Sequence, residues 1–340
     1  GANGTVNALS VGGVDTLIYA GGEFSFLDGT ARPRLGRIRV SDGVLDSDWI
    51  PSIDDGEVRT IEAPNQAAAP RVFVGGSFTR VNGAVARGGV ALNTLNTNSN
   101  TSSWTLNADN PIETLAISTN STRVFAGGSF RSTGMQTRNN IAAFTTAQGD
   151  ITAWAPEVSG GEVFALALSS DKKNLYLGGD FTTVTGTNQA RIARLQTDTG
   201  ALIPWRPNVE SGAVTAFALA GTGKNITRLV FSQNAVFAGS AAGLFRSQDA
   251  GTTWTNISSD LGNAGIADIA LDPNIPQTLY VATLGAGFFK STDGGTRWSK
   301  INTGISNLNA NAIAVASNST TLYAATDALS QTDSGFYRSD

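Results

Sequence analysis

The chain has 340 residues, of which 41% are hydrophobic and 15% charged, and its formal net charge at pH 7 is −4. It contains no cysteine and no histidine, which excludes disulfides, thiolate metal sites, thiol nucleophiles and a Ser-His-Asp triad. Its apolar runs are only as long as a strand, whereas a membrane span needs about 20 apolar residues, so we expect no membrane span. Its lysines form no basic patch, so we expect no nucleic-acid partner.

A repeated motif organises the first 212 residues. The pattern aromatic-x-Gly-Gly-x-Phe occurs in Ile18–Phe24, Val72–Phe78, Val124–Phe130 and Leu175–Phe181. Its first glycines lie 54, 52 and 51 residues apart, at Gly21, Gly75, Gly127 and Gly178. A tryptophan follows each copy, at Trp49, Trp104, Trp154 and Trp205. Self-similarity at such a period is typical of a repeat architecture.

Each early repeat is predicted to contain four short strands. They are Val6–Val11, Leu17–Phe24, Leu35–Val40 and Val44–Trp49 in the first repeat, and Val163–Leu168, Leu175–Phe181, Arg191–Leu195 and Ala201–Trp205 in the fourth. Turn signals separate the last two strands, and no stretch has a helical period. Four-stranded units repeated about every 50 residues predict an all-β fold, a β-propeller with blades of four antiparallel strands.

The motif residues are interpreted as packing residues. The Gly-Gly pair should lie in the second strand of each blade, where neighbouring blades come close. The phenylalanines should fill the space between blades, and each tryptophan should cover the outer region of its own blade.

The four units resemble the delta-sixty β-propeller repeat of bacterial exported proteins and fungal cell-cortex proteins. The resemblance covers residues 6–212 and includes the strand Arg191–Leu195 and the following Thr-Gly turn. It implies a fold and no particular activity.

The repeat changes character from about residue 213. Phe237, Tyr280 and Tyr323 mark a period of 43. The segment Ser247–Trp254 matches the pattern Ser-x-Asp-x-Gly-x-Thr-Trp in full, and Ser291–Trp298 matches it except that Arg297 replaces the threonine. These segments resemble the Asp-box repeats of sialidases, xyloglucanases and photosystem-assembly propellers. The resemblance implies a folding device in which the aspartate binds turn amides and the tryptophan packs beneath. Its residues here are Ser247, Asp249, Gly251, Trp254, Ser291, Asp293, Gly295 and Trp298.

The strand count predicts one propeller of seven blades over residues 1–340. Residues 6–212 give four blades, and residues 213–340 give three Asp-box blades, the last incomplete at Gly335–Asp340. A surplus strand, Val214–Leu219, makes the join irregular, and two separate partial propellers are the alternative. Either Gly1–Thr5 supplies the last strand or the protein continues.

No catalytic motif accompanies these repeats. Glycosidases of the xyloglucanase kind need only two carboxylates, and the candidates are Glu57, Glu162, Glu23 and Asp180. Because these residues occupy equivalent repeat positions, a structural role is the preferred interpretation. We expect no cofactor, and no loop has the acidic spacing of a calcium site.

The composition favours an extracellular or cell-surface protein, because Asn, Thr, Ser and Gly are abundant. The chain begins at Gly1 rather than Met, as expected after removal of a signal peptide or in a fragment. Glycosylation sequons, which also arise by chance in such a composition, occur at Asn3, Asn100, Asn120, Asn225, Asn256 and Asn318.

The favoured function is a non-catalytic binding, adhesion or structural module, such as a subunit of an extracellular filament. Its partners would be proteins or glycans, and the incomplete last blade suggests self-assembly by strand addition. The alternative is a carbohydrate-active hydrolase of the xyloglucanase or sialidase kind. An assembly factor with a basic face built from Arg32, Arg34, Arg37 and Arg39 is a third hypothesis.

Overall fold

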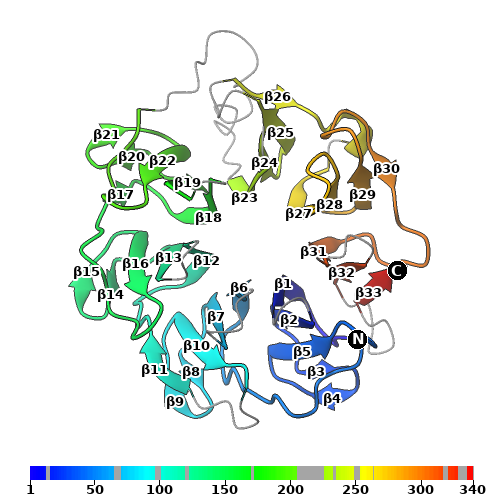
Figure 1. Ribbon diagram of the computed structural model, residues 1–340, viewed down its shortest axis with the longest axis horizontal. Coiled ribbons are helices and arrows are strands. Elements are labelled where there is room, and N and C mark those ends of the chain that lie inside the picture. Colours follow the sequence, from blue (N-terminus) through cyan, green and yellow to red (C-terminus); the bar gives the residue numbers. More distant parts are fainter. Residues whose placement is uncertain are drawn as a thin grey trace.

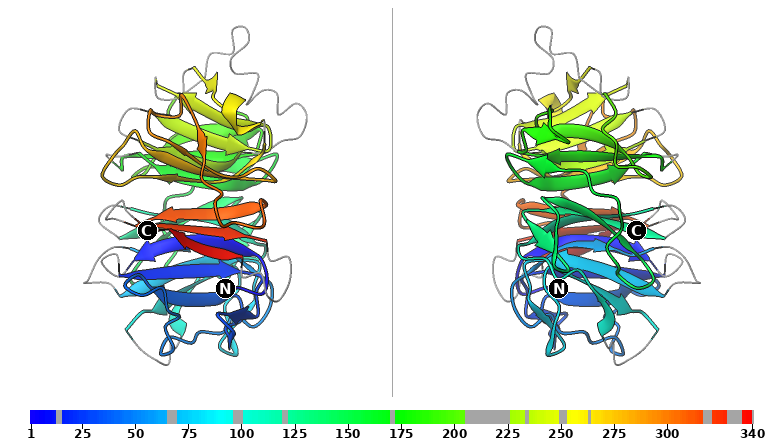
Figure 2. Two further views of the ribbon diagram at one scale, coloured as in Figure 1. Left: turned by 90° about the vertical axis from the view of Figure 1, so that its right-hand side faces the viewer. Right: turned by 90° about the vertical axis from the view of Figure 1, so that its left-hand side faces the viewer.

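The computed structural model describes residues 1–12, 16–64, 70–95, 101–118, 122–169, 172–204, 226–232, 235–248, 253–262, 264–316, 321–327 and 335–339. Within these residues, seven antiparallel sheets stand around a common axis (Figure 1). The side views show the strands running from one face of the ring towards the other (Figure 2). The predicted all-β propeller is confirmed, and the one helical element described is the short 3₁₀ helix η2 (Ser259–Leu261).

We number the seven sheets as blades 1 to 7 in chain order. Blades 1 to 4 consist of β1 (Val6–Gly12), β2 (Leu17–Gly22) and β5 (Leu35–Arg39); β6 (Val58–Glu62), β7 (Arg71–Gly76), β10 (Gly89–Asn93) and β11 (Thr101–Thr105); β12 (Ile112–Ile117), β13 (Arg123–Gly128) and β16 (Ile141–Thr145); and β18 (Val163–Leu168), β19 (Asn174–Gly179) and β22 (Ile192–Gln196). Blades 5 to 7 consist of β23 (Ile226–Phe231), β24 (Val236–Ser240), β25 (Gly243–Ser247) and β26 (Thr255–Asn256); β27 (Ile266–Leu271), β28 (Leu279–Thr283), β29 (Gly287–Ser291) and β30 (Ser299–Lys300); and β31 (Ala310–Val315), β32 (Leu322–Thr326) and β33 (Phe336–Ser339).

Each of the first four blades also carries a small outer hairpin that the sequence analysis did not predict. The hairpin strands are β3 (Phe26–Leu27) with β4 (Thr30–Ala31), β8 (Arg80–Val81) with β9 (Ala84–Val85), β14 (Ser132–Thr133) with β15 (Gln136–Thr137), and β20 (Thr183–Val184) with β21 (Thr187–Asn188) and β17 (Val158–Ser159). Two-residue turns with positive φ at both positions, such as Asp28-Gly29 and Asn82-Gly83, close these hairpins. Such turns suit the right-handed twist of a two-stranded ribbon.

The innermost strands close the ring. Each contacts the innermost strand of the next blade, in the cycle β1, β6, β12, β18, β23, β27, β31 and back to β1. Among the described strands the seven blades therefore form one ring, in which the blade that carries the N-terminus lies beside the blade that carries the C-terminus (Figure 1). The surplus strand predicted at Val214–Leu219 lies outside the described residues.

The Gly-Gly pairs sit in the second strands and permit two close approaches. A Cβ built on Gly75 would lie 2.9 Å from Cγ2 of Ile112, the first residue of the next inner strand. A Cβ on Gly76 would lie 2.0 Å from the carbonyl oxygen of Glu57, which precedes the first strand of the same blade. The equivalent glycines of blades 1 and 3 meet equivalent atoms. The first glycine thus admits the neighbouring blade, and the second admits the backbone of its own blade.

The tryptophans join neighbouring blades, rather than covering the outer region of their own. Trp49 lies edge-to-face on Tyr19, with ring centroids 5.3 Å apart, and its Nε1 donates a hydrogen bond to the carbonyl oxygen of Asn93 in blade 2 at 2.9 Å. Trp104 and Trp154 repeat the arrangement, donating to the carbonyl oxygens of Thr145 at 2.7 Å and Gln196 at 3.0 Å. Trp205 lies outside the described residues.

The fourth strands predicted at Val44–Trp49 and Ala201–Trp205 were too long. In the described residues, each is reduced to one isolated bridge, Ile38 with Leu45 and Leu195 with Leu202. In blade 1, the Asp48 N–H donates to Asp46 Oδ1 at 2.9 Å, and Arg32 Nη2 donates to the Asp46 carbonyl at 3.3 Å. Such bonds to nearby side chains replace the regular strand ladder.

The N-terminal segment does not complete blade 7, so that alternative was wrong. Ala2 pairs with Leu27, and the Asn3 N–H donates to the Phe26 carbonyl at 3.1 Å. The segment therefore belongs to the outer hairpin of blade 1. Its pairing is favoured because Ala2 buries its side chain in the same cluster as Leu27.

We predict that Gly76→Ala lowers the free energy of unfolding by about 3 kcal/mol or more, because the new Cβ meets backbone that cannot move aside. Guanidinium unfolding measures the change. Gly29→Ala is the control, because a Cβ built on Gly29 has no neighbouring atom within 4 Å. Its free energy of unfolding should fall only by the strain of a side chain on left-handed backbone, about 1–2 kcal/mol. Equal losses in the two variants would contradict this account of the glycine pair.

Candidate functional site

A repeated bulge aims side chains at the central channel. The pairing of every described inner strand with its neighbour shifts register at the second residue of the strand. A bulge re-aims a side chain out of the regular alternation. The residues at this position in five blades line a cavity of about 220 Å³, together with Arg228: they are Asn7, Arg59, Glu113, Phe164 and Asn311. Because inner strands begin at one face of the ring, this cavity lies at one mouth of the channel.

Ion pairs and amides join neighbouring blades around this mouth. Arg59 Nε donates to Glu57 Oε1 at 2.7 Å, and Arg59 Nη1 donates to Glu113 Oε1 in blade 3. Asn7 in blade 1 donates from Nδ2 to Glu57 Oε2 at 3.1 Å. Three blades are therefore linked through Arg59 and Glu57.

A second network links blades 5, 6 and 7. Arg228 Nε donates to Asp268 Oδ1 at 2.9 Å, while Asp268 Oδ2 accepts the N–H of Ile313 at 2.9 Å. Asn311 Nδ2 donates to Asp327 Oδ1 at 2.7 Å. The charged and amide side chains around the mouth thus form hydrogen bonds with other residues of the protein.

The carboxyl groups at the mouth have shifted pKa values. The pKa of Glu23 is raised, chiefly by a hydrogen bond with the Glu57 side chain and then by burial. Burial would raise the pKa of Glu57, but hydrogen bonds from Glu23 and Arg59 outweigh it and lower the pKa. Burial raises the pKa of Glu113 despite the opposing charge of Arg59. Glu23 therefore keeps its proton to a higher pH than Glu57, and the protonated Glu23 carboxyl can donate a hydrogen bond to the Glu57 carboxylate.

The structure brings the predicted carboxylates together in two pairs. Glu23 and Glu57 share a hydrogen bond. Glu162 and Asp180 meet differently, because Asp180 Oδ1 accepts the backbone N–H of Glu162. Asp180 thus fixes the turn before the inner strand of blade 4.

Arg59, Glu113, Arg228 and Asp268 were not predicted as site residues. A signal was present, since each is a charged residue within the first strand of a blade. Period-2 alternation alone does not reveal that a bulge turns Arg59 and Glu113 towards the axis.

The Asp-box residues of blade 6 form a tight turn. Asp293 Oδ1 accepts the Ser291 hydroxyl at 2.8 Å and the backbone N–H groups of Thr296 and Arg297 at 2.9 and 3.0 Å. Gly295, at φ +86°, donates to Ser291 Oγ at 2.8 Å. Trp298 packs in the cluster between blades 5 and 6. These contacts fit a structural role, which we keep as a proposal.

The box of blade 5 is described in part. Ser247 and Trp254 are buried, and Trp254 packs between blades 4 and 5. Asp249 and Gly251 lie outside the described residues.

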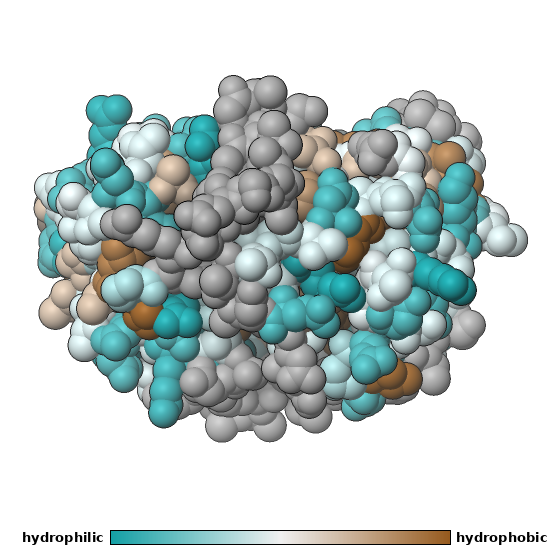
Figure 3. Space-filling model, turned by 90° about the horizontal axis from the view of Figure 1, so that it is seen from above, coloured by the Kyte–Doolittle hydropathy of each residue, from teal (hydrophilic) through white to brown (hydrophobic). Residues whose placement is uncertain are grey.

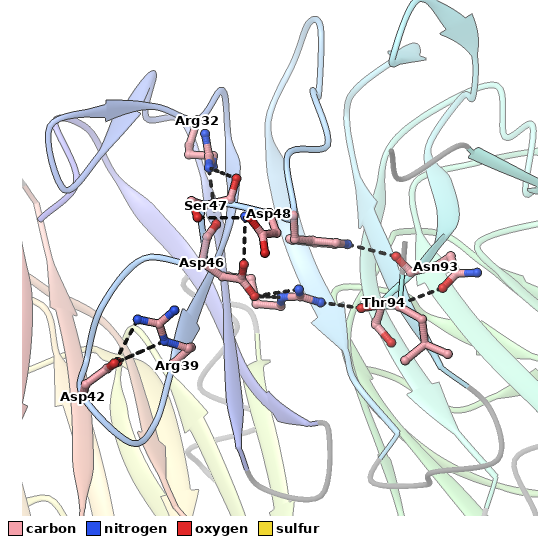
Figure 4. A network of polar contacts seen from close by, with 11 residues as sticks. Arg32, Arg39, Asp42, Asp46, Ser47, Asp48, Asn93 and Thr94 are labelled. Carbon is pink, nitrogen blue, oxygen red and sulfur yellow. Dashed lines mark hydrogen bonds and ion pairs between the residues drawn. The ribbon is translucent and has the colours of Figure 1, made fainter. Parts of the chain in front are cut away.

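The hypothesis of a basic face was wrong for the arginines near Asp46. Arg37 is buried and donates from Nη2 to Asp46 Oδ2 at 2.6 Å and from Nη1 to the Thr94 carbonyl at 2.6 Å. Figure 4 shows Arg32 directed at the Asp46 and Ser47 carbonyls and Arg39 at Asp42. Arg34 donates to the Ile53 carbonyl at 2.8 Å. These guanidinium groups join loops and blades instead of forming a free cationic surface.

Two of the six sequons fall in the described residues. Asn3 is exposed, and its Oδ1 accepts the N–H groups of Ser25 and Phe26, each at 2.8 Å. Asn256 is exposed, and its Oδ1 accepts the Ser258 N–H at 2.8 Å. Asn100, Asn120, Asn225 and Asn318 lie outside the described residues, and glycosylation stays a prediction.

Within the described ranges, no three Asp or Glu residues cluster as metal ligands. The same residues contain no helix long and apolar enough to span a membrane.

Comparisons with known proteins agree with the propeller. The sequence model of the Rax2 C-terminal β-propeller domain matches residues 90–271, more than half of the chain. A GH74 enzyme of Niastella koreensis has a TM-score of 0.63 and 15% sequence identity, over 99% of this chain and 52% of that one. The Cps50 (Swd1) β-propeller domain of Myceliophteria thermophila has a TM-score of 0.66 and 7% identity, over 98% and 96%.

The likeness to the two solved structures shows the fold alone. At such identities the two solved structures show a shared propeller alone, and the chain spans about half the length of the Niastella enzyme. No curated protein matches the sequence. The finer resemblances to delta-sixty and Asp-box repeats stay predictions.

We predict that Arg59→Met lowers the free energy of unfolding by about 2 kcal/mol at pH 7. Breaking a fully buried ion pair costs about 3–5 kcal/mol, and the cost here is smaller because the Arg59 side chain is 31% exposed. Without Arg59, the folded-state pKa values of Glu57 and Glu113 rise. The variant should therefore lose stability as the pH rises and recover towards the parent near pH 4.

Urea unfolding at pH 4 and pH 7 measures the effect of Arg59→Met. Adding Glu113→Gln should restore part of the loss at pH 7, because it removes one of the two facing charges. Arg39→Met, which breaks an exposed pair with Asp42, is the matched control and should have little effect. A loss that is independent of pH would contradict the electrostatic account.

We also predict that Asp293→Ala lowers the free energy of unfolding by about 1 kcal/mol, as loss of a similar side-chain cap does. Hydrogen bonds, first that from the Arg297 N–H, lower the pKa of Asp293, so the contribution is present above its unfolded pKa and lost as the pH falls. Thermal unfolding at pH 7 and pH 3 tests this. Asp198→Ala, at another exposed turn, is the control, and equal effects at both pH values would refute the prediction.

Proposed function

The chain belongs to the family of Rax2 C-terminal β-propeller domains, and from this premise we propose that it is a non-catalytic binding or structural module of the cell surface. Its partner would be a protein or a glycan that docks over the channel mouth lined by Asn7, Arg59 and Asn311. Propellers offer rigid faces made of loops and strand ends from many blades.

The observation that carries this proposal is the state of the carboxylates at the mouth. Glu57 and Glu113 are held by one guanidinium, that of Arg59, and Asp268 is held by Arg228 and a backbone amide. Arg59, Glu113 and Arg228, which these ion pairs hold in place, line a cavity of about 220 Å³ as pre-organised polar groups. They support recognition of a polar ligand at little ordering cost.

The hydrolase alternative finds less support in this geometry. Retaining and inverting glycosidases separate their two carboxyl groups by roughly 5–5.5 Å and 6.5–9.5 Å, which leaves room for the sugar or a water. Glu23 and Glu57 instead share a hydrogen bond, and Asp180 is bound to the backbone of Glu162. The likeness to a GH74 enzyme supplies no further argument, because it concerns the fold.

A surface location is proposed from the delta-sixty resemblance and the composition. Among the coloured residues of the outer wall in Figure 3, most are hydrophilic or neutral, and the hydrophobic ones form no large continuous patch. A wall of this kind suits a protein whose contacts are made at selected faces. Self-assembly through an added strand at blade 7 is part of the same proposal.

We predict binding without turnover. Incubation with xyloglucan and with sialylated oligosaccharides should release no product, whereas a panel of surface glycans and peptides should include a saturable ligand. Glu113→Gln and Arg228→Met should each lower the affinity for that ligand about tenfold or more, since each removes a charge at the mouth.

The outer-rim variant Asp198→Asn is the binding control and should leave the affinity unchanged. Chromatography of reducing ends and surface plasmon resonance provide the two measurements. Hydrolysis that is abolished by Glu57→Gln would overturn the proposal in favour of a glycosidase.

A further inference from the structure

One backbone position recurs directly before the third strand of each of the first four blades. Its residue has a positive φ, between 63° and 75°, and its N–H donates a hydrogen bond to the carbonyl oxygen of the phenylalanine in the repeated motif. In blades 1 to 4 this residue is Arg34, Gly88, Asn140 and Arg191. The fold therefore fixes the backbone at this position, whereas the side chain differs from blade to blade.

In blades 1 and 3 the side chain at this position reaches the next blade. Arg34 Nη1 donates to the carbonyl oxygen of Ile53 at 2.8 Å, and Asn140 Nδ2 donates to the carbonyl oxygen of Val158 at 2.9 Å. Ile53 and Val158 are equivalent residues, because each pairs with the second residue of the outer hairpin of its own blade. An N–H group from one blade thus satisfies a backbone acceptor at the start of the next.

In blade 2 the position has no side chain, and a cavity of about 160 Å³ lies beside Gly88. Ala108 of blade 3, which pairs with its outer hairpin as Ile53 and Val158 do, also lines this cavity. Among the described residues, no donor of the protein reaches the carbonyl oxygens of Ala108 and Asn110. A Cβ built on Gly88 would lie 3.6 Å from the Asn110 oxygen, so this acceptor lies where a side chain would begin.

Two side chains of opposite charge complete the lining of this cavity. The exposed guanidinium group of Arg87 has no partner within the described residues, so it can donate to a bound group. Asp109 Oδ1 accepts the backbone N–H groups of Arg131 and Ser132 at 2.9 and 3.1 Å, which holds its carboxylate beside the cavity. The two charges offset each other, so the cavity suits a neutral polar group.

The arrangement of donors and acceptors selects the kind of group that fits. The Ala108 and Asn110 carbonyl oxygens need N–H donors, which a guanidinium group and a primary amide both supply in pairs. A guanidinium group has no acceptor for Arg87 and repels its charge, whereas the oxygen of an amide accepts a hydrogen bond from it. The volume is sufficient, because a cavity of about 150 Å³ holds benzene, which is larger than an amide group.

We propose that this cavity between blades 2 and 3, the Gly88 cavity, binds a primary carboxamide, the end group of an asparagine or glutamine side chain. The amide nitrogen donates to the carbonyl oxygens of Ala108 and Asn110, and the amide oxygen accepts from Arg87. The Gly88 cavity shares no lining residue with the cavity at the channel mouth, so this inference goes beyond the proposed function.

Titration of the full 340-residue chain with propionamide, followed by nuclear magnetic resonance, tests the proposal. We expect saturable shifts of the backbone amide signals of Ala108 and Asp109. Propionate, which has the same shape without N–H groups, and N,N-dimethylpropionamide should each bind at least tenfold more weakly. Equal affinity for the three compounds, or the absence of a saturable shift with propionamide, would overturn the proposal. Tighter binding of N-acetylglucosamine than of propionamide would assign the cavity to the acetamido group of a sugar and overturn the choice of ligand.

Variants of the chain locate the site. Gly88→Asn places an amide in the cavity from the backbone conformation that Asn140 has in blade 3, and should lower the affinity for propionamide at least tenfold. Gly83→Asn is the matched control, because Gly83 also has a positive φ, +77°, and a Cβ there has no atom within 4 Å. It should leave the affinity unchanged.

A second variant keeps the test independent of packing. A Cβ on Gly88 would lie 3.0 Å from Ala108 Cβ, so neighbouring atoms must shift slightly in Gly88→Asn, and circular dichroism melts establish whether it folds. Arg87→Met leaves the walls of the cavity in place and removes the donor to the amide oxygen, so it should lower the affinity at least fivefold. Unchanged affinity in a folded Gly88→Asn or in Arg87→Met would overturn the assignment.

The two proposals fail separately, because the two cavities have different lining residues. Binding of propionamide without any saturable ligand at the channel mouth would support the Gly88 cavity and remove the proposed function. A ligand at the channel mouth without binding of propionamide would support the proposed function and remove this inference.

Discussion

The structure depends on how closely the backbones approach around the axis. At Gly76 a side chain would run into the Glu57 carbonyl of the same blade, and at Gly75 it would run into Ile112 of the next. The paired glycines therefore set both the spacing inside a blade and the spacing between blades. Interiors pack at the density of organic crystals, so an added methyl group at such a place has nowhere to go.

The tryptophans pack between neighbouring blades, and they do so in two opposite directions along the chain. In blades 1 to 3 the indole reaches forward and donates a hydrogen bond to the following blade. In blades 5 and 6 the box tryptophan packs backward against the preceding blade. Blades 6 and 7 receive neither kind in the described residues, and a groove of about 600 Å³ lies there. The direction in which the tryptophan packs thus differs between the two kinds of repeat.

Bulges shape the surface of the cavity at the channel mouth. In five blades they turn one residue of the inner strand to the cavity at the mouth, and these positions differ in chemistry from blade to blade. Packing constrains their neighbours, whereas these residues are free to vary with function. Arg59 between Glu57 and Glu113 illustrates the result, because it stabilises the mouth and also presents a charged surface.

The sequence by itself determined the propeller, since its Gly-Gly pairs and aromatic residues repeat with a period that local chemistry makes readable. The sequence also named residues for an Asp-box and four carboxylate candidates, and their roles stay predictions. The pairing of Glu23 with Glu57, the bulges that expose Arg59, and the bond from Trp49 to Asn93 were decided only by the tertiary structure. Each joins segments distant in the chain, and no local pattern specifies which backbone atoms meet when rigid blades pack around an axis.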